Sequence, residues 1–289
     1  MQLIQGLLAA VAAGLVYFWS GFYHASKGRP RTTTVNMGVG AVTNFFDTLG
    51  IGSFAPTTAI IKFLRLAKDE NIPGTLNVGH ALPTITQALV FILLIEVDAT
   101  LLLACISASI IGALLGARIV SRLPVNKIRI GMGGALLIAA LLFILRNIGL
   151  MPGGGNAIAL TGGAFASAVV LHFFFGALMT LGIGLYAPSL IALSVLGMDP
   201  RAVFPIMMGA CAFLMPIASL TFIKARRFDP GLALGLTIGG IPTVLIAAFI
   251  VKEMPLDVLR WLVSIVVLAA AGMLLSSGLS FRISAKGLE

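Results

Sequence analysis

Charged residues are scarce in this sequence, at 10% of its 289 positions, whereas ordinary soluble domains carry about 25%. Acidic residues are the scarcest, with ten Asp and Glu together against 19 Lys and Arg. Hydrophobic residues make up 59% of the chain. A soluble protein of this size cannot bury that much apolar surface, so we expect most of the chain to lie in lipid. The same scarcity of charge excludes a sizeable soluble domain.

Cysteine is nearly absent too. Cys105 and Cys211 both lie in apolar runs and have neither disulfide nor metal-ligand spacing, so we interpret them as packing residues. No two of the three histidines have the spacing of a metal site. The sequence therefore predicts no metal and no cofactor. The net charge of +9 arises in short loops without interleaved aromatics, which excludes a nucleic-acid surface and fits the positive-inside rule.

A positive segment ahead of the first apolar run, which a cleaved signal peptide needs, is missing. Leu3 to Phe22 is long enough to span a membrane, and the cations Lys27, Arg29 and Arg31 follow it. We therefore expect a retained helix with the N-terminus outside.

Glycine and proline divide the chain into two similar halves. The stretch T-L-G-I-G-S-F-A-P at 48–56 recurs as T-L-G-I-G-L-Y-A-P at 180–188, identical at seven of nine positions. Pro83 and Pro216 occupy corresponding runs. The sequence predicts a single membrane domain built from an extra N-terminal transmembrane helix and loop at 1–34, repeat 1 at 35–147, a Gly/Pro linker at 148–157, and repeat 2 at 158–281.

Each half opens with an apolar segment that is broken at a G-I-G turn. Residues 35–49, before the first turn, make a helix of about 22 Å, short of the roughly 30 Å core of a bilayer. If both broken segments return to their starting side, fifteen of the 19 cations fall in inside loops, as the positive-inside rule favours. We predict an all-α polytopic membrane protein with about seven transmembrane helices, two re-entrant or broken helix pairs, inverted internal repeats and a cytoplasmic C-terminus.

Inverted halves would place both glycine turns near the midplane, facing one another. A half-helix begins after each turn, and Pro56 or Pro188 falls in its first turn, where a missing N–H costs little. The free N–H groups and positive dipole ends favour an anion. The hydroxyls there either donate to that anion or bond helix carbonyls. The predicted substrate-binding residues are Thr48, Gly50, Gly52, Ser53, Pro56, Thr57, Thr58, Thr180, Gly182, Gly184, Tyr186, Pro188 and Ser189.

Asp47 is the only carboxylate well inside an apolar segment, where acids are expensive and usually functional. Asn44 lies on the same helix face. Their equivalents in the second half are Gly176 and Met179, so the turn itself does not require either residue. Asp47 therefore either carries a proton, helps to hold a sodium ion, or accepts from a loose backbone N–H near the turn.

Histidine can also carry protons near neutral pH. His80 lies ahead of Pro83 at the start of a helix, and it is either a coupling residue or a hydrogen-bonded structural one. His172 stands beside three phenylalanines and is expected at the bundle surface or packed against neighbouring helices. The predicted coupling residues are Asp47, His80 and Asn44.

The duplicated G-x-G-x-x-x-P turn and the element G-A-L-L-G-A-R-I-V-S-R-L-P at 112–124 are similar to those of a known family. From Val35 to Leu279 the chain resembles the TauE/SafE family, also called the sulfite exporter or toluene-sulfonate-uptake permease family. The resemblance implies a carrier of sulfite, sulfonates and related organosulfur anions in a bacterial inner membrane. Ser53 and Leu185 stand where the family's turn is richer in glycine, which leaves the substrate open.

The residues and the resemblance together predict a multi-pass secondary transporter of small organosulfur or sulfur oxyanions, coupled to protons. An anion channel, or a cation-coupled carrier of another small carboxylate or solute, remains an alternative. Ser53 with a histidine would suggest a serine hydrolase, but the second turn has Leu185 in its place, so we predict no enzyme. The expected partners are a small anion and the lipid bilayer, and a homo-oligomer is left open.

Overall fold

The computed structural model describes residues 20–24, 26, 30–120, 125–148, 150, 155–179 and 184–286. Within these ranges the chain is helical, apart from turns and one isolated bridge between Ala157 and Met198. Most of the predicted first helix lies outside the described residues.

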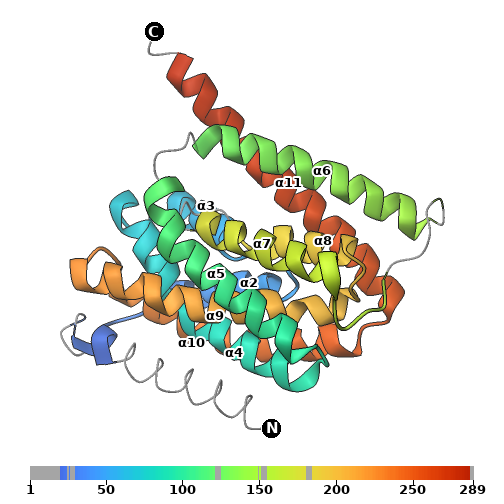
Figure 1. Cartoon of the computed structure of the whole chain (residues 1–289). Coiled ribbons are helices and arrows are strands. Elements are labelled where there is room, and N and C mark those ends of the chain that lie inside the picture. The colour runs from blue at the N-terminus through green and yellow to red at the C-terminus, as the bar shows by residue number, and fades with distance from the viewer. Residues whose placement is uncertain are drawn as a thin grey trace. The chain divides into compact units, whose positions relative to one another are not determined.

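The same order of helices occurs in both halves of the chain (Figure 1). In each half, two shorter helices precede three long ones. The first half contains α2 (Thr34–Thr48), α3 (Phe54–Leu64), the short η1 (Asp69–Asn71), α4 (Ile72–Leu94), α5 (Ala99–Val120) and α6 (Val125–Asn147). The second half contains α7 (Gly162–Met179), α8 (Tyr186–Val195), α9 (Pro200–Ala225), α10 (Pro230–Glu253) and α11 (Leu256–Lys286).

Four of the described helical segments are long and apolar enough to cross a membrane, namely Asp69–Leu94, Gly162–Met179, Pro200–Ala225 and Pro230–Glu253. Three shorter apolar helices accompany them at Phe54–Leu64, Ala99–Leu115 and Tyr186–Val195. The all-helical membrane fold is thus supported. The count of seven crossings and the inverted relation of the halves stay predictions.

The break between α2 and α3 follows from glycine. Gly50 has a φ of 97° and Gly52 a φ of 89°, a left-handed conformation that residues with a Cβ adopt only at a cost. The helix therefore stops at Thr48 and begins again at Phe54. Pro56 is the third residue of α3, where the absence of its N–H removes no helical hydrogen bond.

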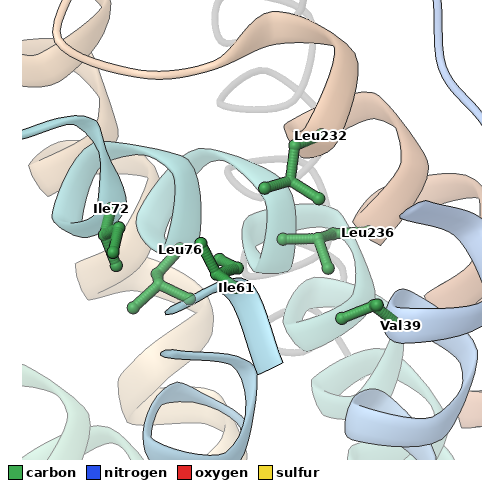
Figure 2. Packing of buried hydrophobic residues seen from close by; sticks show 6 residues of the cluster. All are labelled: Val39, Ile61, Ile72, Leu76, Leu232 and Leu236. Atoms are coloured by element: carbon green, nitrogen blue, oxygen red, sulfur yellow. The ribbon is translucent and has the colours of Figure 1, made fainter. Parts of the chain in front are cut away.

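The helices form two contact units. Unit 1 comprises residues 1–48, 52–94 and 208–250, so it contains α2, α3, α4, α10 and most of α9. Its apolar cluster (Figure 2) joins four helices through Val39, Ile61, Ile72, Leu76, Leu232 and Leu236. Because these residues are buried against one another, they fix α2 and α3 relative to α4 and α10.

A seam of glycines brings α10 against α2 within unit 1. A Cβ on Gly239 would overlap the Met37 carbonyl oxygen, and one on Gly235 would overlap Asn36. From the other side, a Cβ on Gly40 would overlap the backbone of Leu236. The two backbones therefore touch directly, as small residues allow between membrane helices.

Unit 2 comprises residues 49–51, 95–207 and 251–289. Here α5 packs on α7, and α6 lies beside α11 (Figure 1). The crossing of α5 and α7 is reciprocal: a Cβ on Gly112 would overlap the Phe173 carbonyl, and one on Gly176 would overlap the Ser109 carbonyl. Neither position can therefore hold a larger residue without moving the helices apart.

We expect Gly176→Ala to destabilise the protein by about 1–3 kcal/mol, because the added methyl group would push α5 from α7. The measurement is the thermal unfolding midpoint of the detergent-solubilised protein. Gly163→Ala, on the same helix, is the control, because a Cβ there meets nothing within 4 Å. Equal midpoints for the two variants would contradict the close crossing.

Candidate functional site

Asp47 is held inside unit 1 by a side chain from α4. Its side chain is buried near the end of α2, and Gln87 Nε2 donates to Asp47 Oδ2 over 2.9 Å. The same Gln87 nitrogen donates to Thr48 Oγ1, also over 2.9 Å. The Thr48 hydroxyl in turn donates to the Asn44 carbonyl oxygen. Gln87 thus ties the end of α2 to the middle of α4.

The Asp47 carboxylate also lies at the start of α3. The hydroxyl and the backbone N–H of Ser53, the residue just before that helix, both donate to it. An acid near the first turn of a helix is favoured by the helix dipole. The chain's own carboxylate therefore occupies the position predicted for a transported anion in the first half. The second half has Met179 at the equivalent place.

His80 of α4 lies between α2 and α3. Its Nδ1 is 2.9 Å from Asn44 Oδ1, and its Nε2 is 3.1 Å from Thr57 Oγ1. Asn44 donates its amide Nδ2 to the carbonyl oxygens of Gly40 and Leu236, so its Oδ1 must accept from His80. His80 therefore carries its proton on Nδ1, and Nε2 accepts from the Thr57 hydroxyl.

His172 of α7 is fully buried, so of the two expected placements the one packed against neighbouring helices is confirmed and the one at the bundle surface is excluded. Its Nε2 is 2.9 Å from Ser189 Oγ on α8, and its Nδ1 is 2.9 Å from the Ala168 carbonyl oxygen. Ser109 of α5 donates to the carbonyl oxygen of His172 itself. The histidine therefore links α7 to the first turn of α8, and it also lies where α5 crosses.

The other predicted residues are placed as follows. Thr58 donates to the Phe54 carbonyl oxygen over 2.7 Å, which is the helix back-bonding alternative. Gly50 belongs to unit 2, where a Cβ would lie 3.5 Å from Leu190 of α8. A Cβ on Gly52 or Gly184 would meet nothing within 4 Å. Tyr186 and Pro188 are buried in the first turn of α8, and Pro56 is half-buried. Thr180 and Gly182 lie outside the described residues.

Six of the predicted residues thus lie in one buried polar cluster of unit 1, which we call the α2–α4 cluster: Asn44, Asp47, Thr48, Ser53, Thr57 and His80. Gln87 joins them, although sequence reasoning missed it. It follows His80 by seven residues on α4, so the two lie on one face. That spacing of polar residues is the signal that could have identified it. The described residues contain no group of three or more His, Cys, Asp or Glu able to hold a metal ion.

With this geometry in place, the comparison with known families is informative. Residues 1–143 match the family model of the Sulfite exporter TauE/SafE family. The resemblance inferred from the repeated turn is thereby confirmed over this part of the chain. No curated protein and no solved structure matches. The matched part includes every member of the α2–α4 cluster.

The name of the family model describes its members as sulfite exporters. The match and the apolar helices together support a multi-pass membrane protein concerned with transport. An enzyme is not what this family implies. The TauE/SafE match ends at residue 143, within α6, so it does not extend to α7 and α8.

We expect Gln87→Leu to destabilise the protein by about 1–3 kcal/mol, because Asp47 and Thr48 would lose a buried donor. The measurement is thermal unfolding in detergent, made as a double-mutant cycle with Asp47→Asn. The two costs should not add, since both changes break the same contact. Thr86→Val is the control, because its hydroxyl only bonds the Leu82 carbonyl on its own helix. A Gln87→Leu protein as stable as that control would contradict the Asp47 contact.

Proposed function

We propose that this protein is a proton-coupled secondary transporter of a small sulfur oxyanion or sulfonate in a bacterial inner membrane. One observation carries the coupling: the buried Asp47 carboxylate takes donors from both Gln87 and the start of α3. The match to the TauE/SafE family supports the class of cargo.

The chemistry of coupling follows from where Asp47 lies. An ionised carboxylate at the start of α3 repels an incoming anion and uses the Ser53 donors that the anion needs. A proton on Asp47 removes the charge and weakens its hold on those donors. Proton binding and anion binding therefore favour each other, and by linkage each raises the affinity for the other equally.

The hydroxyl of Ser53 faces the Asp47 carboxylate, and His80 is hydrogen-bonded to other residues. His80 Nε2 lies against Thr57, not Ser53. A serine nucleophile requires a general base within hydrogen-bond reach. This arrangement supports transport over hydrolysis.

For the orientation we propose an N-terminus outside, a C-terminus in the cytoplasm and broken segments that return to their starting side. The proposal is supported by the distribution of Lys and Arg among the loops. It is also supported by the length of α2, which at 15 residues is about 22 Å.

The test is uptake into proteoliposomes that contain the purified protein. Sulfite, thiosulfate, taurine, sulfoacetate and isethionate are compared, each with a pH gradient, with a sodium gradient and with neither. We expect saturable uptake of at least one anion, driven by the pH gradient. Asp47→Asn should lower gradient-driven uptake by about a hundredfold, because the titrating group that couples the two ions is lost.

Asp98→Asn provides the matched control. Asp98 is also a helix-start acid, whose Oδ1 accepts from the Leu101 N–H over 2.7 Å, but it lies outside the α2–α4 cluster. Asn caps a helix as well as Asp does, so this variant should transport like the wild type. Non-saturating flux that is insensitive to Asp47→Asn would indicate a channel. Uptake that follows the sodium gradient would indicate a cation-coupled carrier, and no anion flux would contradict the proposal.

A further inference from the structure

Two hydroxyls at corresponding positions are bonded to histidines. Thr57 follows Pro56 and Ser189 follows Pro188, 132 residues further along the repeat. Each is fully buried, and each lies within 3.1 Å of a histidine Nε2. The two half-helices therefore begin with the same hydroxyl–imidazole pair.

The histidines themselves do not correspond. His80 comes from α4, the helix after the first half-helix pair, whereas His172 comes from α7, within the second pair. Ala212 stands 132 residues after His80, and Gly40 stands 132 residues before His172. Duplication of one ancestral segment does not by itself account for both pairs. Both pairs are accounted for if the start of each half-helix requires a hydroxyl that is hydrogen-bonded to an imidazole.

We propose that His80 and His172 are proton-operated switches, each of which decides whether the hydroxyl beside it, that of Thr57 or of Ser189, can donate a hydrogen bond to an anion at the start of its own half-helix. This rests on the proposed function and extends it, because it adds His172 and the second half-helix to the coupling machinery. In both pairs Nδ1 faces an oxygen that can only accept: Asn44 Oδ1 for His80 and the Ala168 carbonyl for His172.

The direction of each bond follows from this. With a neutral imidazole, the proton is on Nδ1 and Nε2 is an acceptor, so the hydroxyl must donate to it and has no hydrogen left for an anion. When a proton from water binds Nε2, the bond reverses. Nε2–H then donates to the hydroxyl oxygen, and the O–H is free to turn toward an anion. No covalent bond other than N–H forms, and the added positive charge also favours the anion.

The groups around each histidine fit such a switch. Among the described titratable residues on elements packed against His80, Asp47 is the one buried in the same cluster. The charged residues of these helices lie toward helix ends: Lys62, Asp69, Glu70, Arg201, Lys224, Lys252 and Glu253. Cys211 of α9 lies near Asp47. Next to α7, the described titratable residues are Cys105 of α5 and Tyr186 of α8, both buried.

Neither Cys105 nor Tyr186 supplies an ordinary counter-charge for a protonated His172. A buried charge without a partner is costly. The anion itself would therefore be the counter-ion at His172, which makes protonation and anion binding there mutually dependent. Since both hydroxyls are buried in the described conformation, the anion reaches them in a state in which the half-helix starts are uncovered.

The first experiment is ¹⁵N NMR of the imidazole nitrogens in nanodiscs, on protein labelled at histidine. Without anion we expect both buried histidines as neutral Nδ1–H tautomers. Thr57→Val should shift only the His80 signals, and Ser189→Ala only those of His172. An Nε2–H tautomer, or signals indifferent to these substitutions, would overturn the proposal without reference to transport.

The second experiment measures uptake of sulfite and isethionate at a series of pH values. Isethionate keeps its charge across the range, so its pH profile reports the protein. His80→Gln and His172→Gln place an amide donor near the former Nε2 but cannot titrate, so each should lower the slope of log uptake against pH by about one. Thr57→Val and Ser189→Ala should lower the affinity about tenfold at low pH, where the imidazole is protonated and the hydroxyl can donate to the anion, and by less at high pH, and Thr57→Ser should restore it.

Thr43→Val and Ser219→Ala are the controls, because both hydroxyls are buried but only bond carbonyls of their own helix. They should change neither slope nor affinity. Anion flux with unchanged pH profiles in both His→Gln variants would overturn the switch while leaving the proposed function intact. Absence of flux in the wild type would instead contradict the proposed function.

Discussion

A helix that breaks in apolar surroundings leaves backbone N–H groups that water cannot satisfy, and the polar chemistry of this protein follows from that constraint. The break at Gly50 and Gly52 frees the first N–H groups of α3. In the first half, the Asp47 carboxylate accepts from the Ser53 N–H. An acid in that place needs donors of its own, which accounts for Gln87 on the neighbouring helix. One interruption of the backbone is thus accompanied by two polar side chains in the interior, those of Asp47 and Gln87.

In the second half, different contacts surround the corresponding pair of helices, α7 and α8. Where α2 has Asn44, α7 has Gly176, whose missing side chain lets the Ser109 backbone of α5 approach. Close packing of two helices has taken the place of a polar contact. His172, one turn before Gly176 on α7, then supplies the partner of the hydroxyl on α8. The two halves keep their helix order but differ in chemistry, and this difference permits one half to carry a resident acid that the other lacks.

Local features of the structure could be predicted from the sequence. The break at residues 49–53 and the proline in the first turn of α3 depend on residues within a few positions of one another. Asn44 and Asp47 share a face through their helical spacing. The match of the first 143 residues to the TauE/SafE family agrees with the repeated turn. Contacts between distant residues could not be predicted, such as the hydrogen bond between Gln87 and Asp47, which are 40 positions apart.

The sequence left the burial of His172 as one of two alternatives for a related reason. α7 is apolar on every side, so the pattern of its residues does not mark which face turns inward. In a soluble protein the polar face of a helix gives that information. In lipid both faces are apolar, and only the packing of α5 and α8 decides.

The glycine seam between α2 and α10 has a mechanical consequence. Because the backbones of Gly235 and Gly239 touch Asn36 and Met37 directly, there is no layer of side chains between the helices that could shear or change rotamer. Separating α2 from α10 would therefore open a gap that no side chain at these positions could fill. The position of Asp47 on α2 is thereby tied to that of α10, whereas the left-handed glycines that free the chain from this packing begin just beyond Thr48.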